Sequence, residues 1–195
     1  MNEQKPVKGM FIVVSGPSGS GKTTLVRHIR EVLPQIGFSV SCTTRAKRPT
    51  EEHGREYFFL TDAEFDTMTA AGKFAEWANV HGKRYGTPVS EIERYILEGR
   101  CVISDVDVAG TKQLREHQNP VVSQNLLTIF VFAGNLRQRL VERGDMTEKQ
   151  IDERLAAVEE EGAHSPYYDE CMTNDDLDQA KEEILAIIRR NISGL

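Results

Sequence analysis

Residues 16–23 read Gly16-Pro17-Ser18-Gly19-Ser20-Gly21-Lys22-Thr23, and they follow the apolar run at residues 11–14. Proteins hold nucleotide phosphates where an apolar strand, a glycine-rich turn and a helix follow one another. The glycines let backbone N–H groups converge on phosphate oxygens, and the helix N-terminus adds a favourable dipole. Lys22 is placed to reach the outer phosphates, and the Thr23 hydroxyl to ligate magnesium. The stretch predicts a nucleoside triphosphate site, because a chance glycine turn would need eight positions and both flanks to agree by accident.

The composition argues against several classes of protein. A formal net charge of −6 is unfavourable for non-specific binding to nucleic acid, which needs a clustered excess of positive charge. Cys42, Cys101 and Cys171 lie far apart without CxxC spacing, so neither a disulfide framework nor a zinc site is indicated. Residues 1–8 are polar, and the apolar runs are too short to span a bilayer. We therefore expect a soluble cytoplasmic protein of one domain that binds no membrane.

Strand and helix patterns alternate along most of the chain. Residues 22–33 form an amphipathic helical pattern that Pro34 stops. Apolar runs at residues 101–104 and 126–132 suit strands that are covered on both faces. This order predicts an α/β fold with a parallel sheet. Further helices are expected from Pro88 with Thr87 as cap, from residue 108 to near Asn119-Pro120, over residues 135–143 and 147–160, and from Asp176.

The middle of the chain has a different pattern, richer in strands. Residues 56–60 and 74–80 are expected to form strands, with Tyr85 on a return strand after a turn at residues 81–83. A short helix between them is opened by the capping box Thr61-x-x-Glu64. Residues 38–43 also alternate as a strand does. The pattern indicates a β-rich lobe inserted into the α/β core.

Beyond the phosphate loop, the order of motifs resembles guanylate kinase over about residues 10–187. The motifs are Ser41-Cys42-Thr43-Thr44-Arg45-Ala46-Lys47-Arg48, Gly54-Arg55-Glu56-Tyr57, Glu76-Trp77-Ala78 and Tyr85-Gly86-Thr87. The resemblance implies an enzyme of purine nucleotide metabolism that recycles GMP by transferring the γ-phosphoryl group of ATP to it, giving ADP and GDP with Mg²⁺. It also implies one domain over residues 1–195 with a five-stranded parallel sheet flanked by helices. Its expected parts are a core at about 9–40 and 88–195, a GMP-binding lobe at about 41–87 and a helical lid at about 137–160.

The residues that match the acceptor motif suit the chemistry of GMP. Arg45 and Arg48 can hold a phosphate bidentately, with tyrosine hydroxyls as further donors. A carboxylate at Glu76 can accept from both the N1–H and the N2 amine of guanine, a pair that adenine lacks. Taken singly, the arginines can also be solvated loop charges, the glutamate a surface carboxylate and the tyrosines core residues. The resemblance assigns GMP binding to Ser41, Arg45, Arg48, Tyr57, Glu76, Tyr85 and Thr87.

Asp105 and Asp107 stand at the end of the apolar strand, where a sheet of this class opens its ligand crevice. Carboxylates at that position suit magnesium, held partly through water, and Asp105 with Thr23 is the predicted metal pair. The resemblance adds contacts from both aspartates to GMP. For Asp107 the alternative is the N-cap of the following helix.

The resemblance also assigns a lid and an adenine-side loop. Arg143 and Arg154 are its lid candidates, because phosphoryl transfer needs cations on the migrating group more than proton chemistry. We leave Arg137 and Arg139 out, since a helix arginine is more often solvated. The predicted catalytic set is Lys22, Arg48, Arg143 and Arg154. The predicted ATP-binding set is Gly16, Pro17, Ser18, Gly19, Ser20, Gly21, Lys22, Thr23, Thr24, Asn174 and Asp175, although Asn174-Asp175 is also an ordinary turn and cap pair.

The match to the family has departures, and two other functions remain open. The family usually has proline at Lys47, glycine at Thr50, aspartate at Glu56 and glutamine at Ala109. These departures concern the affinity for GMP rather than its identity as substrate. One alternative is a related kinase that phosphorylates a sugar bisphosphate or another nucleotide. The other is an inert module of this family that binds protein partners, although such modules lose the loop or the lid. The sequence does not decide between a monomer and a homo-oligomer.

Overall fold

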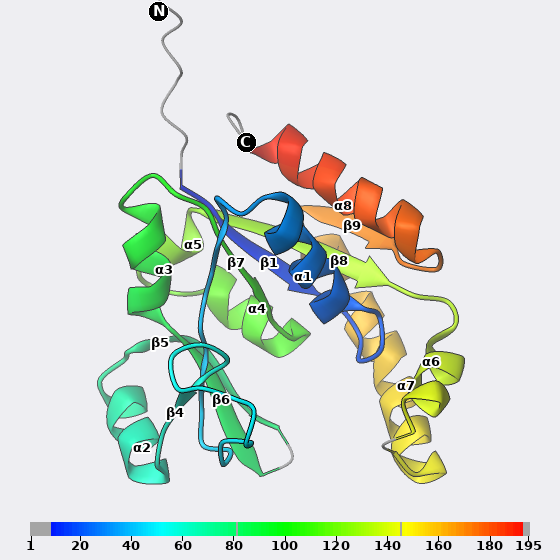
Figure 1. Ribbon diagram of the computed structural model, residues 1–195, viewed down its shortest axis with the longest axis horizontal. Helices are drawn as coiled ribbons and strands as arrows, with labels where there is room; N and C mark the ends of the chain where they lie inside the picture. The colour runs from blue at the N-terminus through cyan, green and yellow to red at the C-terminus, as the bar shows by residue number, and fades with distance from the viewer. Residues whose placement is uncertain (1–8, 81, 145, 193–195) are drawn as a thin grey trace, which may run out of the picture.

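The computed structural model describes residues 9–80, 82–144 and 146–192. Its centre is a five-stranded sheet in which every pair of neighbours runs parallel (Figure 1). In spatial order the strands are β2 (Gly37–Phe38), β7 (Val102–Asp105), β1 (Phe11–Ser15), β8 (Leu126–Phe132) and β9 (Glu170–Thr173). The α/β class and the parallel five-stranded sheet are thus confirmed.

Helices cover both faces of this sheet, which explains the continuous apolar runs of its central strands. Along β1, Ile12 and Val14 belong to one buried cluster, and Phe11 and Val13 to another. The first cluster includes side chains of α1 (Lys22–Val32) and α8 (Leu177–Asn191). The second includes side chains of α3 (Val89–Ile96), α4 (Val108–Arg115) and α5 (Pro120–Ser123).

A second sheet forms the lobe below the core in Figure 1. Its order is β4 (Phe58–Phe59), β3 (Cys42–Thr43), β6 (Lys83–Pro88) and β5 (Phe74–Val80), and α2 (Asp62–Ala70) packs beside it. This lobe has a small hydrophobic core of its own. In it the rings of Phe65 and Phe74 stack with their centroids 4.4 Å apart. The capping box predicted at Thr61 and Glu64 opens α2.

A pair of helices, α6 (Leu136–Arg143) and α7 (Glu148–Ala163), extends from the core at the side opposite the lobe (Figure 1). A capping box of Thr147 and Gln150 opens α7, which continues beyond the predicted end. The short helix η1 (Ser165–Tyr167) leads from α7 back to β9. Within the described ranges, no helix combines the length and the apolar character needed to cross a membrane.

Several boundaries differ from those predicted. The strand expected at residues 38–43 is two short strands in two sheets, because the chain crosses from core to lobe between Ser39, whose N–H donates to the Ile103 carbonyl, and Cys42. Pro88 rather than Thr87 is the N-cap of α3, and Thr87 lies on β6. Asn119 begins α5 rather than ending α4. The edge strand β9 is not predicted at all, since its four residues mix polar and apolar side chains.

Candidate active site

Three glycines of the phosphate loop, Gly16, Gly19 and Gly21, have a backbone conformation that other residues rarely adopt. Gly16 has a φ of +136° and Gly21 a φ of +91°. A Cβ on Gly16 would lie 2.3 Å from the Val131 carbonyl oxygen, and one on Gly21 would lie 2.2 Å from Nδ2 of Asn174. Any side chain at these positions would therefore strain the loop and displace its neighbours. Gly21 leads directly into α1, as a phosphate-binding loop requires.

Lys22 and Thr23 begin α1 and point to different partners. The Lys22 ammonium donates to the Gly16 carbonyl at 2.5 Å and to the Pro17 carbonyl at 2.8 Å. Burial lowers its pKa, although the nearby carboxylate of Asp105 opposes that shift. The Thr23 hydroxyl donates to Oδ2 of Asp105 at 2.8 Å. Because β7 and β1 are neighbours in the sheet, the hydroxyl and carboxylate predicted as a metal pair meet at its carboxyl edge.

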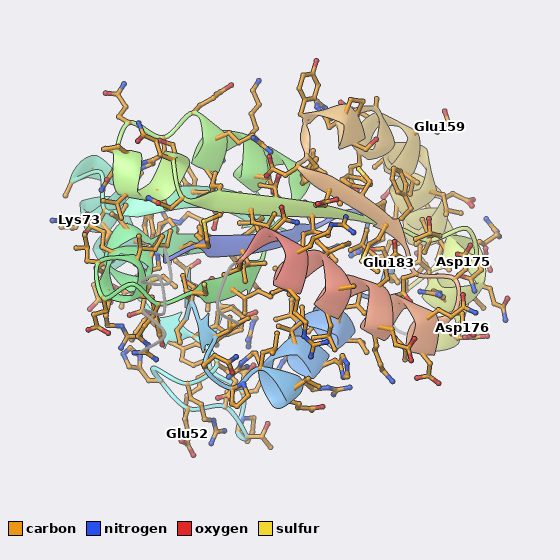
Figure 2. The ribbon with its side chains drawn as sticks, turned by 90° about the horizontal axis from the view of Figure 1, so that it is seen from above. Glu52, Lys73, Glu159, Asp175, Asp176 and Glu183 are labelled. Atoms are coloured by element: carbon orange, nitrogen blue, oxygen red, sulfur yellow. The ribbon has the colours of Figure 1, made fainter. Side chains whose placement is uncertain are left out.

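A cavity of about 650 Å³ opens over this loop. Asn174 reaches its wall from the loop after β9, where its Nδ2 donates to the Ser20 carbonyl at 2.7 Å. Its Oδ1 is buried and has no hydrogen-bond partner among the described residues. Asp175 is instead exposed at the edge of the molecule beside Asp176 (Figure 2), and it accepts from the Gly134 N–H at 2.7 Å. The predicted ATP residues on the cavity wall are Ser18, Gly19, Gly21, Lys22, Thr23, Thr24 and Asn174.

Arg139 lines this same cavity, although it is absent from the residues predicted for the site. Its half-buried side chain donates to the Asn174 carbonyl. Arg137 behaves differently, because it pairs with Glu148 at 2.8 Å and Asp152 at 2.7 Å and so ties α6 to α7. The sequence feature that could have identified Arg139 is its spacing. It stands four residues before Arg143, so both positions lie on one face of a helix.

A second pocket, of about 240 Å³, lies between the lobe and the carboxyl end of β7. Glu76 is only 8% exposed there, and Thr87 Oγ1 donates to its Oε1 at 2.5 Å. The hydroxyl of Ser41 lies 3.5 Å from that of Thr87, so Thr87 lies between Ser41 and Glu76 in a series of polar contacts. Burial raises the pKa of Glu76 to about 7, opposed by the Thr87 hydrogen bond and aided by Asp107. The predicted GMP residues that line the pocket are Ser41, Tyr57, Glu76, Tyr85, Asp105 and Asp107.

Asp107 serves as the N-cap of α4, the alternative that the sequence left open, while it also lines the second pocket. Its Oδ1 accepts from the Gly110 N–H at 2.6 Å. The Glu76 carboxylate lies against this turn, since a Cβ on Gly110 would be 2.8 Å from Oε2 of Glu76. The first turn of α4 therefore forms one wall around the carboxylate.

Arg45 and Arg48 share a partner that the sequence analysis missed, Glu51. Arg45 contacts the Glu51 carboxylate through Nη2 at 2.7 Å and through Nη1 at 3.0 Å. These hydrogen bonds, with one from the Arg48 backbone, lower the pKa of Glu51 to about 2. The Arg45 guanidinium lies 5.5 Å from the ring of Tyr57, which packs edge-to-face against Tyr85 at 5.8 Å. The structure thus places Arg45 beside both predicted tyrosines.

The helical pair contributes Arg154, whose guanidinium donates to the Ser18 hydroxyl of the phosphate loop. Arg143 is the last residue of α6, and its side chain lies outside the part that the structure describes. Glu161 of α7 is half-buried, and burial raises its pKa although Lys22 and Arg154 lie near it. Glu159 points outward at the rim (Figure 2). Sequence reasoning missed Glu161 because it stands in the run Glu159-Glu160-Glu161, which is typical of a solvated helix end.

Comparisons with known proteins identify the family of this chain. The family model described as guanylate kinase matches residues 8–191. The guanylate kinase of Rubrobacter xylanophilus is 41% identical over 190 residues, which are 96% of this chain and 97% of that protein. The guanylate kinase of Thermotoga maritima is 37% identical over 188 residues, covering 94% and 87%. A crystal structure of guanylate kinase from Anaplasma phagocytophilum superposes with a TM-score of 0.71 at 27% identity, covering 96% and 88%.

Proposed function

Because the chain belongs to the guanylate kinase family, we propose that its two cavities hold the two substrates, with ATP over the phosphate loop and GMP beside Glu76. The chain is an ATP:GMP phosphotransferase, which converts ATP and GMP into ADP and GDP. The proposal concerns which residues perform each part of this reaction.

One observation carries the acceptor assignment: Glu76 is buried in a pocket that also holds two tyrosine hydroxyls and lies near Arg45. An ionised carboxylate there can accept from the N1–H and the N2 amine of guanine. Adenine presents an acceptor and no amine at those positions, so it would leave the buried charge without partners, which is costly. The Thr87 hydroxyl, which donates to Glu76, fixes the direction of the carboxylate. Arg45, Arg48, Tyr57 and Tyr85 then hold the phosphate of GMP.

On the ATP side, loop amides and Lys22 hold the phosphates, and Arg139 with Asn174 borders the adenine end of the cavity. The oxygen donors of Thr23 and Asp105 are of the type that Mg²⁺ prefers, and they already lie 2.8 Å apart. They would hold the ion, which when bound neutralises charge on the phosphates. This supports Mg²⁺ as the companion of ATP.

The transfer itself needs the two phosphate groups in line and their charge neutralised. Lys22 and Arg154 contact the phosphate loop, and Arg48 stands in the lobe, where its N–H donates to Glu51. We assign to them, with Arg143, the stabilisation of the migrating phosphoryl group in a direct displacement without a covalent enzyme intermediate. Glu161, near Lys22 and Arg154, adds a carboxylate that helps to orient these cations.

The test is magnesium-dependent release of ADP from ATP, with GMP, AMP, CMP, UMP or a sugar bisphosphate offered separately. We expect release with GMP alone. Lys22→Ala should lower kcat by at least about a hundredfold, because it removes a cation from the developing charge. Glu76→Ala should mainly raise the KM for GMP.

Each failure in this test has its own meaning. Equal and negligible effects of the two substitutions would overturn the residue assignments while leaving the family activity in place. Release with another acceptor would show that Glu76 does not read guanine. Binding of GMP without any release of ADP would favour the inert module.

A further inference from the structure

Glu51 lies in the loop between β3 and β4, and it is only 9% exposed although it is charged and close to solvent-facing residues. Both carboxylate oxygens are engaged. Oε1 accepts from Nη2 of Arg45 at 2.7 Å, and Oε2 accepts from Nη1 of Arg45 at 3.0 Å and from the Arg48 N–H at 2.8 Å. One carboxylate therefore contacts both of the arginines that the proposed function assigns to the phosphate of GMP.

The hydrogen bonds of Arg45 show which of its donors remain. A guanidinium has five N–H groups. One on Nη2 and one on Nη1 go to Glu51, and the other on Nη1 goes to the Ala46 carbonyl at 2.9 Å. The Nε–H and the second Nη2–H form another edge of the guanidinium, where they point in parallel, and the side chain also interacts with the Tyr85 hydroxyl. Such a pair matches two oxygens of a phosphate.

Arg48 is held in another way. Its carbonyl accepts from the Glu51 N–H at 3.1 Å while its own N–H donates to the Glu51 carboxylate, so residues 48–51 form a closed turn. The Lys47 ammonium donates to the Glu51 carbonyl at 3.1 Å and fixes the same turn. The Arg48 guanidinium makes no hydrogen bond or close ion pair with the rest of the described chain, although its charge acts on Glu51 at longer range.

We propose that Glu51 is a positioning residue for the acceptor phosphate: it holds Arg45 by one pair of N–H groups so that the other pair faces the phosphate, and it holds the turn from which Arg48 extends. This proposal rests on the proposed function, which places the phosphate of GMP at these arginines. Two flexible arginines would otherwise lose side-chain entropy when the nucleotide binds. Glu51 orders one of them in advance, and preorganisation of this kind increases affinity.

The test compares a nucleotide with its nucleoside. Glu51→Gln keeps the shape of the side chain but replaces one acceptor by a donor that opposes Arg45. We expect the Kd for GMP to rise about tenfold to a hundredfold, as for the loss of one charged hydrogen-bond pair. The Kd for guanosine, measured by NMR titration, should not change, because guanosine has no phosphate. The KM for GMP should rise with little change in kcat, and Glu51→Asp should lie between the two.

The matched control is Glu52→Gln. Glu52 is the adjacent residue, and it points outward (Figure 2). Among the described residues its carboxylate pairs with Arg55 of the same loop, at 3.0 Å. This substitution changes the net charge equally, so unchanged GMP binding in it is expected. If Glu52→Gln weakens GMP as much as Glu51→Gln, the effect is one of overall charge and the proposal fails.

Arg45→Lys separates the positioning role from the proposed function. Lysine cannot form the paired contact, so adding Glu51→Gln to it should weaken GMP binding little further. If Arg45→Lys weakens GMP but Glu51→Gln does not, positioning by Glu51 is refuted and the phosphate site stands. If neither substitution weakens GMP, the phosphate site itself is wrongly assigned. Equal weakening of GMP and guanosine by Glu51→Gln would show a general role in folding and overturn the proposal.

Discussion

Glu76 is a single carboxyl group whose environment should make substrate binding depend on pH. Burial raises its pKa to about 7, and guanine needs the ionised form. GMP affinity should therefore fall about tenfold when the pH is lowered from 8 to 6, since the ionised fraction falls by that factor. Calorimetric titration over this range measures it. The phosphate of GMP titrates in the same range, so Glu76→Gln serves as control, and an equally steep dependence in that variant would contradict the role of Glu76.

The same carboxyl group should make the folded protein less stable at higher pH, whereas it makes GMP binding stronger. Its pKa in the folded protein lies above the ordinary value of 4.5, so between these values the folded state binds more protons than the unfolded state. Its contribution to stability is greatest below pH 4.5 and is lost as the pH rises through 7. Relative to the wild type, Glu76→Gln should gain up to about 3 kcal/mol between pH 5 and pH 8. Urea denaturation at both pH values tests this, and parallel curves would contradict it.

At the scale of elements, one side chain of the helix α4 hydrogen-bonds the backbone of the edge strand β5. Gln113 accepts from the Trp77 N–H at 3.1 Å and donates to the Trp77 carbonyl at 3.0 Å, as a neighbouring strand would. Glu76 is the residue that precedes Trp77 on β5. Gln113→Ala should destabilise the protein by about 1–2 kcal/mol through two lost hydrogen bonds, measured by urea denaturation, and raise the KM for GMP.

The matched control for this helix is Gln118→Ala. Gln118 is exposed beyond the end of α4 and makes no hydrogen bond with another described side chain. Its replacement should change neither stability nor kinetics. If Gln113→Ala lowers stability while the KM for GMP stays the same, the contact supports the fold without positioning Glu76.

The sequence predicts an element well when adjacent residues determine it, and poorly when contacts with distant parts of the chain determine it. The strand Leu126–Phe132 was predicted at its observed bounds, because seven residues carry a strong pattern. The strand Glu170–Thr173 was missed, because only its pairing with β8 makes it a strand. The site follows the same rule. The phosphate loop is predictable from adjacent residues. Glu51 is identified only by its contacts with Arg45, and the place of Arg139 at the cavity, despite its helical spacing to Arg143, only by its contact with Asn174.

At the scale of the whole molecule, the cations assigned to the reaction stand on separate bodies. Arg48 belongs to the lobe and Arg154 to the helical pair, which extend from opposite sides of the core in Figure 1. Phosphoryl transfer requires both near one migrating group, so binding of both nucleotides should draw these bodies together. Fluorescence transfer between labels at Glu52→Cys and Glu153→Cys should increase with a ligand that joins adenosine and guanosine through phosphates. Either nucleotide alone should give a smaller change.

The cysteines of this chain make such labelling selective. Cys42 and Cys101 are buried and Cys171 is exposed, so Cys171→Ser removes the one accessible thiol in the described chain. A second label pair at Glu31→Cys on α1 and Glu183→Cys on α8 reports on the core alone, because these helices pack on the same face of the sheet (Figure 2). Transfer between that pair should stay constant. If saturating ligand leaves transfer between lobe and helical pair unchanged as well, the two bodies do not approach, and Arg154 acts only on the phosphate loop.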